Sequence, residues 1–224
     1  MTSTEQIVLW ILAFAATHMG MASLRVRPRL VAALGEGAYL GIYTVVSFAT
    51  FVPLVMAYLR GIHGGAMLWN LRSVPVVHAV ALGVAWLSFT LALAALVQPS
   101  PASIGPRTTT RARGLTRITR HPLFMNIGIW GLAHCVVNGF VNDVLFFGGI
   151  FLVGLFGCMH QDARKRVTEK GVLDEFYAET SLVPFAAIAT GRGKLVPGEL
   201  PWIGIAVGGV ASLALYHFHD AMFH

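Results

Sequence analysis

Six apolar stretches of roughly 20 residues constrain this chain more than any other feature. They lie at residues 6–24, 35–59, 74–97, 122–139, 142–161 and 200–218. A helix needs about 20 mostly apolar residues to cross the hydrocarbon core of a bilayer. We therefore expect an all-α, polytopic membrane helical bundle with about six transmembrane helices, forming a single domain over residues 1–224.

The lysines and arginines indicate how the bundle is oriented. Short cytoplasmic loops of membrane proteins collect these residues, and three alternate loops carry three, five and six of the 16 in this chain. They are Arg25, Arg27 and Arg29; then Arg107, Arg111, Arg113, Arg117 and Arg120; then Arg164, Lys165, Arg166, Lys170, Arg192 and Lys194. We expect a bacterial-type inner membrane with both termini periplasmic. The net charge of +6 then reflects topology rather than nucleic-acid binding.

One segment outside the apolar stretches has a membrane-related pattern of its own. Residues 162–192 mix charged side chains with Leu173, Phe176 and Phe185. This pattern predicts an amphipathic helix lying along the inner membrane surface. His160, beside the charged run, is expected to be solvated.

Apart from His160 and His217, which lie at the ends of their stretches, three histidines lie inside apolar stretches: His18 in the first, His78 in the third and His134 in the fourth. An ionisable residue within a span indicates a functional site, because its exposure to lipid is costly. The ordinary alternative is a histidine hydrogen-bonded between helices. Gly131, one turn before His134, leaves a side-chain-free patch on which a flat macrocycle could lie. Since no carboxylate accompanies these histidines at depth, the residues favour a heme over a bare metal ion.

The stretch RITRHPLFMNIGIWGLAH, residues 117–134, joins a charged rim to one of these histidines. Pro122 suits the first turn of a helix, so His121 should lie at its mouth, a candidate catalytic residue. Arg117 and Arg120 at the same rim are cations of the kind that heme propionates bind.

The residues alone do not select one ligand pair. His18 and His134 differ by about 8 Å in expected depth, whereas His134 and His78 lie closer to one level. His78 is therefore kept as the alternative partner of His134.

The second apolar stretch carries polar side chains on one helical face. Glu36, Tyr39, Tyr43 and Ser47 recur at steps of three and four residues, which is the period of a helix. Tyr43 is a candidate for orienting a ligand histidine or a substrate. Hydrogen bonding between helices explains the same stripe.

Two long motifs, HMGMASLRVRPRLVAALGEGAYLGIYTVVS and RITRHPLFMNIGIWGLAH, resemble the NnrU family, which includes the plant zeta-carotene isomerases; so does the later segment YAETSLVPFAAIATGR. The resemblance implies heme b held in a helical bundle by two histidines, and redox-dependent cis-to-trans isomerisation of the central double bond of zeta-carotene. Carried over by position, the ligands fall on His18 and His134, with His121 near the site. A lipid-soluble polyene would enter sideways from the bilayer.

Two further functions stay open. Family members in denitrifying bacteria are associated with nitrite and nitric oxide reductase function, so the alternative is a non-enzymatic heme protein supporting denitrification or membrane electron transfer. RHPLF also resembles a motif of isoprenylcysteine-type S-adenosylmethionine methyltransferases. However, Phe124 stands where those enzymes usually have Tyr, and Glu169 stands alone where paired glutamates are expected. The expected partners are membrane lipids and a redox partner; a homo-oligomer is compatible with the sequence.

Overall fold

The computed structural model describes residues 1–103, 109–219 and 221; Arg107 of the third loop lies outside them. Long apolar helices coincide with the six predicted stretches: α1 Ser3–Met21, α3 Glu36–Leu59, α4 Pro75–Val97, α6 Pro122–Val137, α8 Gly149–Thr168 and α11 Trp202–His217. The shorter elements are α2 Val26–Leu34, β1 Met67–Trp69, α5 Leu115–Ile118, β2 Gly139–Phe140, α7 Val141–Asp143, the π-helix η1 Val144–Gly148, α9 Asp174–Glu179, α10 Ala186–Ala189 and the 3₁₀-helix η2 Pro197–Glu199. β1 and β2 pair antiparallel.

Fewer of these helices qualify as membrane spans than the sequence predicts. Among the described residues, α3, α4 and the helical run Val141–Thr168 are long and apolar enough to cross a bilayer. α1 and α2 would make a fourth span together, but they meet at a bend of 69°. α6 and α11 are apolar but have 16 residues each, or about 24 Å of helix against a core of about 30 Å. Three or four candidate spans result, and the predicted six are not confirmed.

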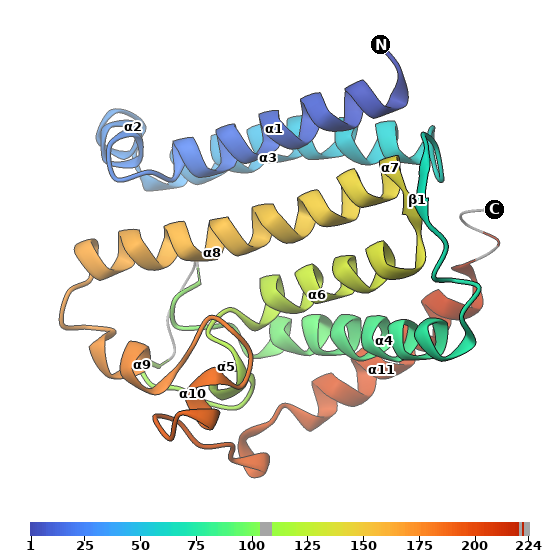
Figure 1. Cartoon of the computed structure of the whole chain (residues 1–224). Helices are drawn as coiled ribbons and strands as arrows, with labels where there is room; N and C mark the ends of the chain where they lie inside the picture. Colours follow the sequence, from blue (N-terminus) through green and yellow to red (C-terminus); the bar gives the residue numbers. More distant parts are fainter. Residues whose placement is uncertain (104–108, 220, 222–224) are drawn as a thin grey trace.

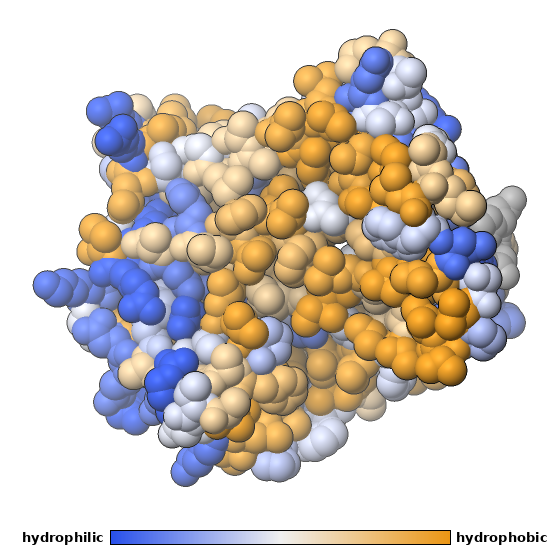
Figure 2. Space-filling model, viewed as in Figure 1, coloured by the Kyte–Doolittle hydropathy of each residue, from blue (hydrophilic) through white to orange (hydrophobic). Residues whose placement is uncertain are grey.

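The long helices run alongside one another in alternating directions (Figure 1). α1 packs on α3, α4 packs on both α6 and α11, and α6 packs on α8. The short helices α2, α9 and α10 belong to the segments that contain basic residues, and they lie at one end of the bundle. The first turn of α1 lies at the opposite end. Hydrophilic residues gather at this basic end, and apolar residues dominate the surface of the helices beyond it (Figure 2). The arrangement agrees with the predicted alternation of the loops.

At the end opposite the basic loops, a buried cluster ties the helices together. The ring of Tyr58 on α3 stacks on Phe146 of η1, with centroids 4.2 Å apart. Its hydroxyl donates to Asp143 Oδ1 at 2.8 Å, and the ring nitrogen Nδ1 of His63 lies 2.8 Å from the other carboxylate oxygen. Asp143 is fully buried, so these bonds supply the partners that a buried carboxylate requires.

The predicted interfacial helix over residues 162–192 is not confirmed. α8 continues to Thr168, and the remainder forms the separate short helices α9 and α10. The chain breaks at Gly171 and Phe185, both of which have positive φ. Leu173 and Phe176 are buried against Ala102 and Ala112 instead of facing a membrane surface. Leu173 and Phe176 therefore belong to a small core of their own, whereas Phe185 is exposed.

Candidate functional site

A cavity of about 700 Å³ lies between the α1–α3 pair and the α6–α8 pair. Its volume is in the range typical of cofactor and substrate sites. α1 and α8 approach closely at Gly149, where an added Cβ would lie 2.9 Å from Ile11, and the cavity lies on the basic side of that contact. The walls are mostly apolar and include Phe14, Phe48, Phe51, Leu96, Leu123, Ile127, Trp130, Phe146, Ile150 and Val153.

His18 lies on the cavity wall, and its hydrogen bonds define its tautomer. The hydroxyl of Ser47 donates to the carbonyl of Tyr43 at 2.8 Å. The proton of that hydroxyl is thereby used, so the 3.1 Å contact between His18 Nδ1 and Ser47 Oγ is made by an Nδ1–H donor. Nε2 then carries the free lone pair, which is the form of imidazole that binds a metal.

Tyr43 also lines the cavity, next to His18. Its hydroxyl donates to the backbone carbonyl of His18 at 3.3 Å, and the two rings lie 4.9 Å apart. Within the polar stripe of α3, Tyr39, Tyr43 and Ser47 therefore lie against protein, whereas Glu36 is exposed. Tyr43 and Ser47 contact His18.

His134 is not among the residues that line this cavity. Its Nδ1 lies 2.8 Å from the carbonyl of Trp130, and its ring packs against Trp130 at 4.3 Å and Phe147 at 4.6 Å. A Cβ at Gly131 would lie 2.9 Å from the carbonyl oxygen of Phe147. The patch that we expected to be open beside His134 is thus filled by backbone.

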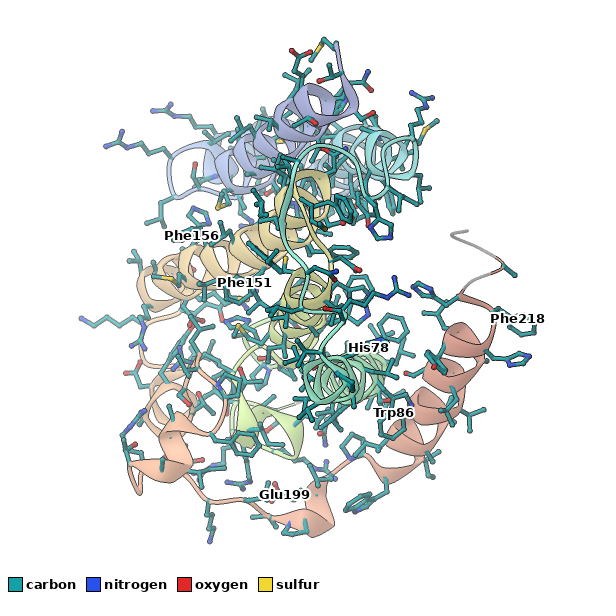
Figure 3. The ribbon with its side chains drawn as sticks, turned by 45° about the vertical axis from the view of Figure 1, so that its right-hand side comes forward. His78, Trp86, Phe151, Phe156, Glu199 and Phe218 are labelled. Carbon is teal, nitrogen blue, oxygen red and sulfur yellow. The ribbon has the colours of Figure 1, made fainter. Side chains whose placement is uncertain are left out.

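His78 lies in the first turn of α4 (Figure 3), at the end of the bundle away from the basic loops. It is not a cavity residue either. The structure therefore brings His18 and Tyr43 together, with His121 and His160 on the same cavity, and leaves His78 and His134 apart from them.

The predicted arginine–histidine–proline motif forms a buried polar network, the cap network of Arg120, His121, Asp162, Tyr177 and Thr180. Arg120 donates to Asp162 Oδ2, to Thr180 Oγ1 at 3.1 Å and to the Thr180 carbonyl at 3.0 Å. Asp162 Oδ1 also lies 2.8 Å from His121 Nε2 and accepts from the Tyr177 hydroxyl at 3.2 Å. Burial and the carboxylate raise the pKa of Tyr177, which keeps its hydroxyl a donor. This network joins α6, α8 and α9.

Arg117, the second arginine expected to hold a propionate, is also engaged. Its Nε donates to Glu199 Oε2 at 2.7 Å and its Nη2 to Oε1 at 3.1 Å. The hydrogen bonds from Arg117 hold the pKa of Glu199 below its ordinary value. Figure 3 shows Glu199 in the connection that precedes α11. Both predicted propionate partners are therefore bound to protein carboxylates.

Sequence reasoning missed the cavity face of α8. His160, expected to be solvated, lines the cavity together with Arg164, whose residue surface is only 9% exposed. The lining positions on α8 include 150, 153, 154, 157, 160, 161 and 164, a spacing of three and four that marks one helical face. Cys158 on the same helix is buried and free, as is Cys135. Within the described residues, no three His, Cys, Asp or Glu side chains are grouped to hold a metal ion.

Comparisons with known proteins identify a family. The family described as "NnrU protein" matches residues 6–224. The chain is 27% identical over 238 residues to the chloroplastic 15-cis-zeta-carotene isomerase of Zea mays, covering 99% of this chain and 62% of that protein. It is 31% identical over 235 residues to the Arabidopsis thaliana protein of the same name, covering 96% of this chain and 60% of that protein. No solved structure matches the chain.

The relatives differ from this chain in length, and they differ from its predicted location. The chain spans about three fifths of the length of the curated relatives it matches. Both relatives are chloroplastic, which does not fit the bacterial-type inner membrane with periplasmic termini that the sequence led us to expect. The apolar helices support membrane association.

Proposed function

We propose that this chain, which belongs to the NnrU family, is a membrane enzyme that converts the central cis double bond of a zeta-carotene-type polyene to trans. The observation that carries the proposal is the similarity over nearly the whole chain to two proteins named 15-cis-zeta-carotene isomerase. The apolar cavity provides a place for such a substrate. A polyene hydrocarbon offers no hydrogen-bonding group, so its binding rests on apolar burial.

The aromatic walls suit a conjugated chain. Phe14 and Phe51 pack against each other with centroids 5.3 Å apart, and Trp130 faces the cavity from α6. Such side chains bury a large apolar area and contact a π-system favourably. In this proposal they hold the polyene and exclude water from it.

The residues of the cavity fit heme b as the cofactor, because the site combines apolar walls, an imidazole prepared for a metal, and a cation. Bound heme would supply an iron centre whose affinity for a π-bond depends on the oxidation state of the iron. Interaction of the iron with the double bond would lower the barrier to rotation about that bond. We propose His18 as the iron ligand on the cavity wall, with Ser47 and Tyr43 as positioning residues.

For the second ligand, the family resemblance gives His134, with His78 as the alternative. The Nδ1 contact of His134 to the Trp130 carbonyl leaves Nε2 as its lone-pair nitrogen, which supports the proposal, although the residue packs behind Trp130. His160 is a further imidazole on the cavity. Heme content of the His134→Ala, His78→Ala and His160→Ala variants separates these candidates.

The activity is tested with the detergent-solubilised full chain and 15-cis-zeta-carotene, with and without a reductant. The proposal predicts that the 15-cis isomer is lost, as measured by chromatography. It also predicts that the rate of this loss depends on whether the reductant is present. A heme-loaded chain that leaves the substrate unchanged in both states overturns the isomerase proposal and favours a non-enzymatic heme protein.

A pair of glycine variants tests the cavity itself. Gly157 lies on the cavity wall and Gly83 on α4 does not, and an added Cβ meets nothing within 4 Å at either position. Gly157→Leu should therefore place its side chain at the cavity wall, where it narrows the cavity, and reduce isomerisation by at least about tenfold, roughly 1.4 kcal/mol of barrier. Gly83→Leu is the matched control and should retain activity. Equal activities would place the reaction elsewhere.

A further inference from the structure

Arg164 on α8 is a buried cation without a partner for one of its nitrogens. It is 9% exposed, and its Nε is buried and has no hydrogen-bond partner. Within the part of the chain that the structure describes, no ion pair to its guanidinium is found. Burying an unpaired charge is costly, so a group that remains in this state is expected to have an anionic partner in the working protein.

The position of Arg164 indicates the chemistry of this partner. It lines the same cavity as His18 and Tyr43. Along α8, the cavity face is apolar at Ile150 and Val153 and becomes polar at His160 and Arg164, toward the basic end of the molecule. A ligand that matches this wall has a large apolar body and an anionic end directed toward the basic loops.

Neighbouring cations do not compete for this role. Arg120 is bound to Asp162 and Thr180, and Arg117 to Glu199. Lys165, the next residue along α8, donates to the Ser103 carbonyl at 3.1 Å and lies 3.3 Å from Glu169 Oε1. These three cations already have protein acceptors.

We propose that Arg164 binds a propionate carboxylate of the heme in this cavity. The inference rests on the proposed function, because it takes the ligand to be heme. Guanidinium and carboxylate form short, charge-assisted hydrogen bonds with two parallel contacts. Such a bond would satisfy the orphaned Nε and direct the porphyrin edge toward the basic end, with its apolar body along Ile150 and Val153.

The test compares two porphyrins that differ only in charge. Hemin has free propionates, and hemin dimethyl ester has neutral methyl esters. Each is titrated into the detergent-solubilised, heme-depleted full chain, and the absorption change gives its Kd. Four proteins are compared: the native chain, Arg164→Gln, Arg164→Lys and, as a matched control, Arg29→Gln, which removes an exposed cation of the same basic end. Gel filtration of each variant verifies that it is folded.

Arg164→Gln should weaken hemin binding by about tenfold or more, which corresponds to at least about 1.4 kcal/mol, because it removes a charge-assisted hydrogen bond. It should leave the affinity for the dimethyl ester unchanged. The native chain should prefer hemin to the ester by a similar factor, Arg164→Lys should retain part of that preference, and Arg29→Gln should behave as the native chain.

The outcomes separate the two proposals. Equal native affinity for hemin and its ester, or an Arg164→Gln protein that keeps the preference, overturns the role of Arg164 while leaving the heme in place. A variant that weakens both porphyrins equally also overturns it, because the side chain then acts only on the fold. A native chain that binds neither porphyrin overturns the heme proposal, and the inference with it.

Discussion

Two buried arginines at the basic end of the bundle have opposite surroundings. Arg120 is 7% exposed and donates from all three guanidinium nitrogens to Asp162 and Thr180. Arg164, only two positions after Asp162 on α8, is 9% exposed and has an orphaned Nε. One arginine completes a protein network, and the other borders a cavity. The comparison distinguishes Arg120, whose charge is used within the protein, from Arg164, whose Nε has no acceptor within the protein.

The same contrast applies to the histidines. Nε2 of His121 lies at hydrogen-bonding distance from Asp162, so this member of the most recognisable motif is used to hold helices together. His18 uses Nδ1 on Ser47, and its Nε2 is left for a ligand. Both histidines border the same cavity, but His121 of the conspicuous motif is bound to the cap network through Asp162, whereas Nε2 of His18 is not used in that way.

The largest effect is expected from Asp162→Asn. This change leaves Arg120 buried without a counter-charge, which typically costs about 3–5 kcal/mol. It should lower the free energy of unfolding accordingly, measured by SDS titration in mixed micelles. Glu175→Gln is the matched control, because it breaks the exposed Arg111–Glu175 pair and should cost less than about 1 kcal/mol. Equal losses of unfolding free energy in the two variants would show that the cap network around Arg120 does not have the structural role assigned to it.

A smaller effect is expected from Gly131→Ala. The new Cβ would lie 2.9 Å from the Phe147 carbonyl, and such overpacking costs about 1–3 kcal/mol. Gly83→Ala, where the Cβ meets nothing within 4 Å, should not reduce stability. If Gly131→Ala instead weakens heme binding and leaves stability intact, a porphyrin lies beside Gly131 and the cavity of His18 is not its site.

The smallest effect concerns the Arg117–Glu199 pair at the rim. Its hydrogen bonds lower the pKa of Glu199 from an ordinary value of 4.5. The ion pair therefore stabilises the fold above about pH 4.5 and loses that contribution as the pH falls through the lower folded pKa. Native chain and Glu199→Gln should differ by less than about 1 kcal/mol at pH 6, and their unfolding curves should converge in acid. A constant difference would contradict the pairing.

The sequence predicted the helices well and their packing less well. Hydropathy located five of the six apolar helices within a few residues, because membrane-length runs leave little choice of structure. The sixth, α8, begins and ends seven residues later than the predicted stretch 142–161. The six predicted spans are not confirmed, because α6 has only 16 residues and α1 meets α2 at a bend of 69°. The interfacial helix was not confirmed because Leu173 and Phe176 find a partner in Ala102 and Ala112, a contact between segments distant along the chain.

For the site, the types of residue in the sequence indicated which side chains were candidates, but they did not indicate which side chains bind one another. His18 and Tyr43 were selected because polar groups at membrane depth need protein neighbours, and the structure places both on the cavity. Arg164 was counted only as a loop cation, because its burial results from packing between segments that are distant along the chain. The engagement of Arg117 and Arg120 was equally hidden, since their carboxylate partners lie far along the chain, at Asp162 and Glu199.

The central claim, that the cavity of His18 holds a heme, is tested most directly by the absorption spectrum of the full chain purified from heme-replete cells. The native protein should show a Soret band that shifts on reduction, and His18→Ala should lose most of its heme. His63→Ala is the control, because this histidine contacts Asp143 at the opposite end, and it should keep its heme. A colourless native protein, or equal heme in the native chain and His18→Ala, would contradict the claim.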